Sequence, residues 1–332
     1  MPGRPTMSDV AERAGVSRAL VSIVFRDVPG ASTETRVRVR AAADELGYRP
    51  DRRARLLSRR RTQVLGVVFA LGHEFHADLI ARLYRSAAAH GQELALSGTT
   101  AGRDEAEAAA DLLSLRCDAL LLIGGERPEP ELAELAGSVP VVVLARATTA
   151  AGLDVVRTDD AAGAALAARH LLDLGHTRVV HVDGGATAGA DERRQGFAAA
   201  VAAAGVPADV ERGGLTEDDG AAAAERLLAR PDLPTGLSVF NDQSAAGVLA
   251  VLQQAGRRWP EDVSVVGYDD SRLARSRWTR LTTVRQDGDV LAGLAVRRAV
   301  ERVEEPDRPA REDLVEPSLV VRASTGPPPG RS

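Results

Sequence analysis

Residues 6–22 read TMSDVAERAGVSRALVS, and their pattern predicts the fold of the N-terminal part of the chain. Ser8 and Ser17 can each cap a helix, and Gly15 allows the left-handed backbone of a tight turn between the two helices. The apolar faces of these helices are Val10, Ala11 and Ala14, and Leu20, Val21 and Val24. The pattern is typical of a helix-turn-helix, which presents its second helix to the major groove of DNA. An ordinary helical hairpin at the edge of a domain is the alternative.

A third helix is predicted over residues 30–48. Ser32 or Thr33 can cap its start, and Gly47 is a typical stop. After Pro50, residues 51–57 can form a short helix rich in arginine. We therefore expect a small all-α head over residues 1–50, joined by a short helix and linker at 51–62 to the rest of the chain.

The head is basic although the whole chain is acidic. Residues 1–61 contain fourteen Arg and seven Asp or Glu, which gives a formal charge of +7, whereas the chain as a whole carries −5. A basic head on an acidic body suits a DNA-binding protein with a separate regulatory part, because cationic side chains neutralise phosphates. A generic solvated charge run is the alternative, but the helix-turn-helix pattern in the same segment argues against it.

From residue 63 the pattern changes to short apolar runs that alternate with amphipathic helices. Strands are predicted at 64–71, 93–97, 119–123, 139–144, 155–158, 178–182, 236–240, 263–268 and 282–285. Helices are predicted near 76–90, 103–115, 161–174, 190–204, 218–229, 243–256 and 288–304. Such alternation predicts parallel sheets covered by helices on both faces. Two units, near 63–157 and 158–286, each fit one open sheet.

Several classes of protein are excluded or disfavoured. A single cysteine, Cys117, permits neither an intrachain disulfide nor a cysteine-cluster metal site. The six histidines lack metal-ligand spacing, a chain without Lys has no lysine-bearing phosphate loop, and no serine sits in a nucleophile elbow. We therefore expect no enzymatic activity, cofactor or metal. No apolar run is long enough for a membrane span or a signal peptide, so we expect no membrane association and a cytoplasmic location.

The chain strongly resembles the lactose-repressor family of bacterial transcription regulators. The matching strings are SDVA at 8–11, AGVS at 14–17, VS at 21–22, ELGYRP at 45–50 and VVGYDD at 265–270. The resemblance implies a helix-turn-helix head joined to an α/β body like a periplasmic sugar-binding protein. The body would have two parallel-sheet lobes and three crossings of the chain between them. Its domain would span 63–325, with lobe one at about 63–157 and 288–316, lobe two at about 158–287 and 317–325, and a disordered tail at 326–332.

The resemblance also implies which residues contact DNA. Arg18 and Ala19 occupy the positions where the family reads base edges, and arginine can make a bidentate contact to guanine. Contact of Arg18 with phosphate alone is the alternative. Ser17 and Ser22 are expected to bond phosphates, which set register without reading sequence. The position after Ser22 is Arg in many relatives but Ile23 here, which leaves base preference open there.

Residues 50–57 resemble the family's hinge helix. Such a short, basic segment is not stable alone, so we expect it to order when paired with its twin in a minor groove. Leu57 matches the leucine wedge that kinks a base step. Ala54, which is small enough to enter the groove, and Arg52 or Arg55 would flank it. A flexible linker is the alternative.

A small-molecule effector site is expected between the lobes, at the strand ends where open sheets bind ligands. The candidate residues are Phe75, Arg146, Arg193, Asn241, Asp269 and Gln286. A structural ion pair is the alternative for Arg193 and Asp269, and a turn-forming role for Asn241. We expect Asp242 to be no more than a helix cap and Asp270 to be structural.

Two departures from the family pattern leave the chemical class of the effector open. The family often has Asp before Arg in the loop after residue 144, where this chain has Ala145-Arg146, and the stretch around Gly214 lacks a tryptophan that some relatives stack on a sugar. The effector can be an unusual sugar, a carboxylated compound bound by Arg146 and Arg193, or absent.

Together these features predict a homodimeric transcription regulator that binds near-palindromic double-stranded DNA under the control of a small molecule. The favoured activity is repression. A solute-binding receptor with the same body is the main alternative, and an enzyme of sugar metabolism is a weaker one.

Overall fold

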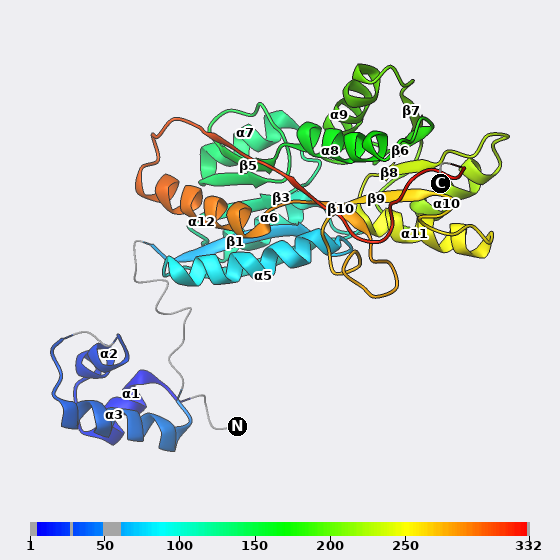
Figure 1. Cartoon of the computed structure of the whole chain (residues 1–332). Coiled ribbons are helices and arrows are strands. Elements are labelled where there is room, and N and C mark those ends of the chain that lie inside the picture. Colours follow the sequence, from blue (N-terminus) through cyan, green and yellow to red (C-terminus); the bar gives the residue numbers. More distant parts are fainter. Residues whose placement is uncertain (1–4, 27–28, 49–60, 331–332) are drawn as a thin grey trace. The chain divides into compact units, whose positions relative to one another are not determined.

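The computed structural model describes residues 5–26, 29–48 and 61–330. The chain divides into two compact units, Met1–Thr62 and Gln63–Ser332, which we call the head and the body (Figure 1). Each is described by itself.

The described part of the head contains helices α1 (Met7–Ala14), α2 (Arg18–Arg26) and α3 (Thr33–Leu46). The predicted cap at Ser8 is wrong, because Thr6 caps α1. The Thr6 hydroxyl accepts from the Asp9 N–H, and the Asp9 carboxylate accepts from the Thr6 N–H over 2.7 Å. This reciprocal capping box needs an acidic residue three positions after the cap, which Thr6 has.

Left-handed glycines end the first and third helices of the head. Gly15 has φ of 63° and Gly47 has φ of 64°, and each cap N–H bonds carbonyls of the preceding turn. Ser32 caps α3, as one of the two predicted alternatives. The helices share one apolar core, which contains Val10, Ala11, Ala14, Val21, Val24, Val39, Ala42 and Ala43. The predicted helix-turn-helix is therefore the fold of the head.

The first sheet of the body is parallel and contains β1 (Val64–Ala70), β2 (Glu93–Thr99), β3 (Ala119–Ile123), β4 (Val141–Leu144), β5 (Asp154–Thr158) and β11 (Glu312–Val315). Its strand order is β11-β5-β4-β3-β1-β2. Helices α5 (Glu74–Ala89) and α12 (Gly288–Glu304) contribute to one apolar core on this sheet, and α6 (Glu105–Ser114) and α7 (Glu129–Ser138) contribute to a second. These elements form lobe one.

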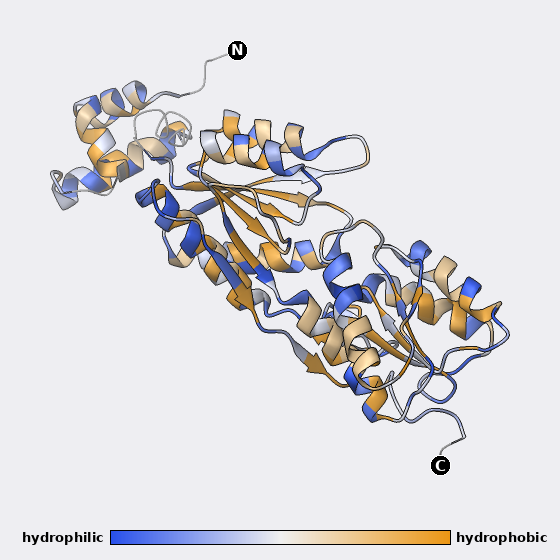
Figure 2. Ribbon diagram, turned by 90° about the horizontal axis from the view of Figure 1, so that it is seen from above, coloured by the Kyte–Doolittle hydropathy of each residue, from blue (hydrophilic) through white to orange (hydrophobic). Residues whose placement is uncertain are grey.

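The second sheet contains β6 (Val179–Val182), β7 (Asp209–Glu211), β8 (Gly236–Val239), β9 (Ser264–Asp269), β10 (Thr282–Arg285) and β12 (Ser318–Val320). Its order is β12-β10-β9-β8-β6-β7, and only β12 runs antiparallel to its neighbour. Helices α8 (Asp160–Asp173) and α9 (Ala190–Ala203) pack together, as do α10 (Glu217–Leu228) and α11 (Asp242–Gln254). These elements form lobe two. Figure 2 shows the strands of both sheets as largely hydrophobic.

The chain passes between the two sheets three times, after β5, after β10 and after β11. The loops that follow the parallel strands are thereby placed where one lobe meets the other. The sequence pattern did not predict α7 or the short strands β7, β11 and β12. The sequence predicted a disordered tail that begins at Gly326, but Gly326 itself is ordered. Its N–H donates to Ser264 Oγ over 3.0 Å, and its carbonyl oxygen lies 2.9 Å from His176 Nε2.

Candidate functional site

Helix α2 presents a polar face in the head. Ser17 caps it, and the Leu20 N–H donates to the Ser17 Oγ over 3.2 Å. Arg18 and Ala19, in its first turn, are exposed, and Ser22 is half-buried. Val21 and Val24 are completely or almost completely buried in the core of the head. The capped first turn of α2 therefore carries two exposed side chains, Arg18 and Ala19.

The other four predicted DNA contacts, Arg52, Ala54, Arg55 and Leu57, lie outside the described residues.

The body contains a cavity of about 440 Å³ lined by loops of both lobes. This volume falls in the usual range for small-molecule sites. Five of the six predicted effector residues line it, namely Phe75, Arg193, Asn241, Asp269 and Gln286. The structure thus brings together side chains that are up to 211 positions apart in the sequence.

Arg146, the sixth residue, does not line this cavity. Its Nη2 donates to the backbone carbonyl of Arg127 over 2.9 Å. The residue before it, Ala145, does line the cavity and has a left-handed φ of 55°. Arg146 therefore supports the loop that carries Arg127, and Arg127 itself lines the cavity.

Arg193 forms the ion pair that was the alternative to ligand contact, and it lines the cavity as well. Its Nε donates to Asp160 Oδ1 over 2.8 Å, and its Nη1 donates to the Phe240 carbonyl over 2.6 Å. Its guanidinium also lies 3.5 Å from the centroid of the Tyr268 ring. These contacts hold the cation rigidly at the cavity wall and neutralise it.

Asp269 and Gln286 form a second polar group in the cavity. Gln286 Nε2 donates to Asp269 Oδ1 over 2.7 Å, and the Thr158 hydroxyl donates to Gln286 Oε1 over 2.8 Å. Burial raises the pKa of Asp269 to about 8; Arg193 opposes this shift and Asp242 adds to it. At neutral pH a protonated Asp269 can donate a hydrogen bond to a ligand oxygen.

Asn241 caps α11 and lines the cavity. Its Oδ1 accepts from the Ser244 N–H over 2.7 Å, and its Nδ2 donates to the Leu215 carbonyl over 3.1 Å. The expectation that Asp242 is only a cap is wrong, since Asn241 is the cap. Asp242 instead accepts from the Ser271 N–H and from the Thr283 hydroxyl.

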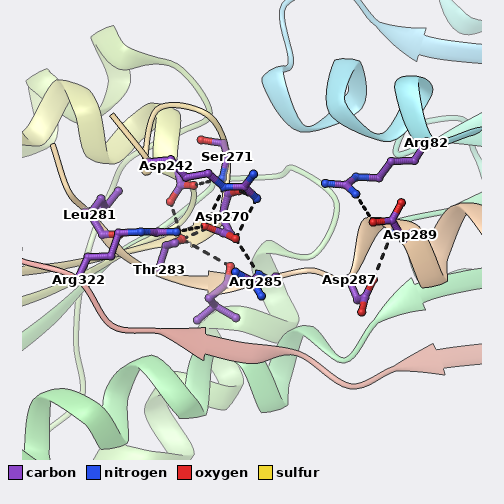
Figure 3. A network of polar contacts seen from close by, with 12 residues as sticks. Arg82, Asp242, Asp270, Ser271, Leu281, Thr283, Arg285, Asp287, Asp289 and Arg322 are labelled. Carbon is purple, nitrogen blue, oxygen red and sulfur yellow. Dashed lines mark hydrogen bonds and ion pairs between the residues drawn. The ribbon is translucent and has the colours of Figure 1, made fainter. Parts of the chain in front are cut away.

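Asp270 is structural, as expected. It forms ion pairs with Arg275, Arg285 and Arg322, and only 1% of its side chain is exposed. Figure 3 shows the pairs with Arg285 and Arg322. In the same region Arg82 of α5 pairs with Asp289 of α12 (Figure 3). These ion pairs fix the strand ends and the helix starts around the crossing between β10 and α12.

The sequence pattern did not single out the charged residues on the lobe-one wall, which include Glu105 and Arg127. Beside the predicted Phe75, the side chains of His73 and His76 also line the cavity. The two imidazole rings stack with their centroids 4.1 Å apart, and burial lowers the pKa of both. The dipeptide Gly124-Gly125 after β3 was the available signal. Both glycines have left-handed φ, and an added Cβ would lie 3.3 Å from the His76 ring at Gly124 and 2.1 Å from the Glu105 carboxylate at Gly125.

Among the described residues there is no group of three or more His, Cys, Asp or Glu side chains that could hold a metal ion. No helix in the same part of the chain is long and apolar enough to cross a membrane.

Comparison with known proteins gives two family matches. Residues 6–51 match the model of the bacterial regulatory proteins of the lacI family, and residues 168–325 match a periplasmic binding protein-like domain. The HTH-type transcriptional regulator GalR of Salmonella typhimurium is 34% identical over 331 residues, which cover 97% of this chain and 96% of GalR.

Two solved structures are similar over nearly the whole chain. The lac repressor dimer bound to operator and the anti-inducer ONPF has a TM-score of 0.85 and 27% identity, with 98% of this chain and 100% of that chain covered. A complex of the transcriptional regulator CelR with cellobiose has a TM-score of 0.72 and 30% identity, with 97% and 100% covered.

Proposed function

The chain belongs to the lacI family of bacterial regulatory proteins, and from this premise we propose that it is a transcriptional repressor that binds operator DNA under the control of a small molecule. One observation carries the proposal: the capped start of α2 exposes Arg18 and Ala19 on a basic head that is separate from the ligand-sized cavity. The family consists of regulators, so the chain is not an enzyme. Its place of action would be the cytoplasm, where bacterial DNA lies.

In the proposed complex α2 lies in the major groove. Arg18 donates two hydrogen bonds to a guanine, and Ala19 meets an apolar group such as a thymine methyl. Ser17 and Ser22 bond phosphates. Arg52, Ala54, Arg55 and Leu57 would act in the minor groove, where Leu57 enters a base step and bends the duplex.

A homodimer would place two heads on a near-palindromic site, because a two-fold dimer requires a two-fold target. The effector would bind between the lobes and prefer one of their relative arrangements. Only such a difference in affinity lets a ligand shift the population of the DNA-binding form.

The effector that fits the cavity best is an uncharged, hydroxyl-rich molecule such as a sugar. Each arginine that lines the cavity is already paired: Arg193 with Asp160, Arg127 with Glu105, and Arg103 with Asp111. A carboxylated effector held by Arg146 and Arg193 is less favoured, because Arg146 bonds the Arg127 carbonyl instead.

A gel-shift experiment tests DNA binding. DNA fragments from upstream of the chain's own gene and of its neighbours are titrated with protein at several salt concentrations. Arg18→Ala should weaken binding to the retarded fragment by about tenfold to a hundredfold, as expected for one bidentate base contact. Arg257→Ala removes the same charge from an exposed position of the body and should leave affinity unchanged. A folded protein that retards no fragment even at low salt would contradict the proposal.

The hinge has its own test. Leu57→Ala should reduce affinity for the specific fragment much more than affinity for unrelated DNA, because only the specific complex would contain the bent base step. Equal losses on both DNAs would refute the wedge role.

A further inference from the structure

Glu105 and Arg127 form a polar pair on the lobe-one wall of the cavity. Arg127 Nε donates to Glu105 Oε1 over 3.2 Å, and only 10% of the Arg127 side chain and 14% of the Glu105 side chain are exposed. Glu105 comes from the first turn of α6, and Arg127 from the loop between β3 and α7. Both residues line the cavity.

The pair has hydrogen-bonding capacity that the described residues do not use. Arg127 Nη2 is buried and has no hydrogen-bond partner among them. A buried donor without a partner is costly, so a ligand or water that reaches it gains from the contact. Burial raises the pKa of Glu105, an effect that the charge of Arg127 opposes.

The absence of a side chain at Gly125 leaves space for the Glu105 carboxylate. Gly125 has φ of +86°, and a Cβ there would lie 2.1 Å from Glu105 Oε2. The Arg146 guanidinium donates to the Arg127 carbonyl over 2.9 Å, which makes Arg146 a positioning residue for the loop. The local structure thus holds a carboxylate and a guanidinium side by side at the surface of a cavity.

A carboxylate next to a guanidinium is complementary to two neighbouring hydroxyl groups. One hydroxyl oxygen can accept from Arg127 Nη2, and the adjacent hydroxyl can donate to the Glu105 carboxylate. An anionic group fits poorly, because Asp104, Glu126 and Glu131 line the same wall.

The cavity has room for more than one sugar ring. Its volume of about 440 Å³ falls in the range of sites that enclose drug-sized ligands, which have more non-hydrogen atoms than one hexose. A ligand that reaches Arg193 and Asp269 on lobe two therefore has space left toward Glu105 and Arg127 on lobe one.

We propose that Glu105 and Arg127 form a specificity subsite that binds the vicinal diol of an uncharged saccharide of at least two rings. This inference rests on the proposed function, because it concerns the effector of the same cavity. The subsite would extend the effector site predicted from the sequence at Arg193, Asn241 and Asp269 to the lobe-one wall of the cavity. A ligand that bonds both lobes would hold them in one relative arrangement.

Calorimetric titration of the full-length protein tests the subsite. The probes are the neutral disaccharides cellobiose, lactose, maltose and melibiose, their constituent monosaccharides, and glucuronate and cellobionate. At least one neutral disaccharide should bind at least about tenfold more tightly than its monosaccharides. Glu105→Gln and Arg127→Met should each remove about that factor from the disaccharide affinity, since each deletes hydrogen bonds to a charged group.

Monosaccharide affinity should stay the same in both variants, because a single ring would occupy the Arg193 and Asp269 end. Glu134→Gln makes the same substitution at an exposed position of α7 that does not line the cavity, and it should bind like the wild type. Thermal melting and operator binding without ligand establish that each variant is folded.

Three results would overturn the subsite: no neutral disaccharide binds, the two variants bind the disaccharide as tightly as the wild type does, or a sugar acid is the ligand that needs Arg127. Any of them can occur while the ligand-free protein still binds its operator, and the proposed regulator function would then stand. Failure of the wild-type protein to bind any upstream fragment, both without ligand and with each of the probes, would instead contradict that function.

Discussion

Arg193 Nε lies 2.8 Å from Asp160 Oδ1, in an ion pair whose side chains are only 7% and 6% exposed. The pair joins α9 to the start of α8 inside lobe two. Arg193 also stacks on Tyr268, a residue of β9. A side chain that forms part of the cavity wall is therefore also a structural link between three elements.

Breaking this pair should destabilise the body strongly. Asp160→Leu leaves a buried guanidinium without its carboxylate, and Arg193→Met leaves the buried carboxylate without its guanidinium. Each change should lower the free energy of unfolding by about 3–5 kcal/mol. The double variant Asp160→Leu/Arg193→Met should lose less than the sum by at least about 1 kcal/mol, because it leaves no unpaired charge. Urea denaturation measures all three; strictly additive losses would show that the two groups are not coupled.

The lobe-two side of the cavity could be predicted because Asn241 and Asp269 each lie at the end of a predicted strand. Phe240 ends a predicted strand directly before Asn241, and Asp269 follows another apolar run, so the parallel-sheet rule places both at the same edge. Arg193 was found from the resemblance and not from its own surroundings. Its partner Asp160 was missed because an ion pair between two helices leaves no local pattern in the sequence.

The lobe-one side was harder to predict for a geometric reason. Arg146 and Arg127 both follow strands, and sequence alone does not show which guanidinium faces the cavity. The left-handed φ of Ala145 accompanies an Arg146 side chain directed toward the neighbouring loop, whose carbonyl it bonds. The short strands β7 and β12 were missed because three residues are too few to display an alternating pattern.

Close packing of α10 against α11 depends on two glycines. A Cβ at Gly247 would lie 1.9 Å from the Glu217 carbonyl oxygen, and a Cβ at Gly220 would lie 1.9 Å from the Ser244 carbonyl oxygen. Gly247→Ala should therefore lower the free energy of unfolding by about 1–3 kcal/mol through overpacking. Gly293→Ala is the matched control within α12, where a Cβ meets nothing within 4 Å, and it should stabilise by about 0.5–1 kcal/mol. Thermal and urea melts followed by circular dichroism measure both; a neutral Gly247→Ala would disprove the close contact.

Stability should fall in acid because His181 is buried and neutral. Burial, assisted by the charge of Arg193, lowers the pKa of His181 to about 3, and its ring stacks on Phe197 with the centroids 5.4 Å apart. In the unfolded chain this histidine takes up a proton near its ordinary pKa of about 6.5, so below that pH the unfolded state binds more protons than the folded state.

His181 alone should lower the free energy of unfolding by up to about 1.4 kcal/mol for each unit by which the pH falls between about 6.5 and 3. His181→Leu should remove this contribution and make the profile between pH 6.5 and 5 less steep by about 1 kcal/mol per pH unit, because the histidine of the unfolded chain is only half protonated at pH 6.5. Urea melts at closely spaced pH values provide the measurement. An unchanged slope in the variant would mean that His181 is protonated in the folded protein.

Cys117 should be unreactive until the body unfolds. Cys117 is 7% exposed just before β3, and burial, with a smaller effect of Asp118, raises the pKa of its thiol to about 11. The thiolate is the reactive form, so a pKa about two units above the ordinary value reduces labelling at pH 8 by about a hundredfold, and burial slows it further. A disulfide reagent such as DTNB should therefore label the protein slowly in buffer and fully in denaturant, whereas Cys117→Ser should not be labelled in either. Rapid labelling of the native protein would show that this edge of lobe one opens far more readily than its packing against Leu112 and Leu120 implies.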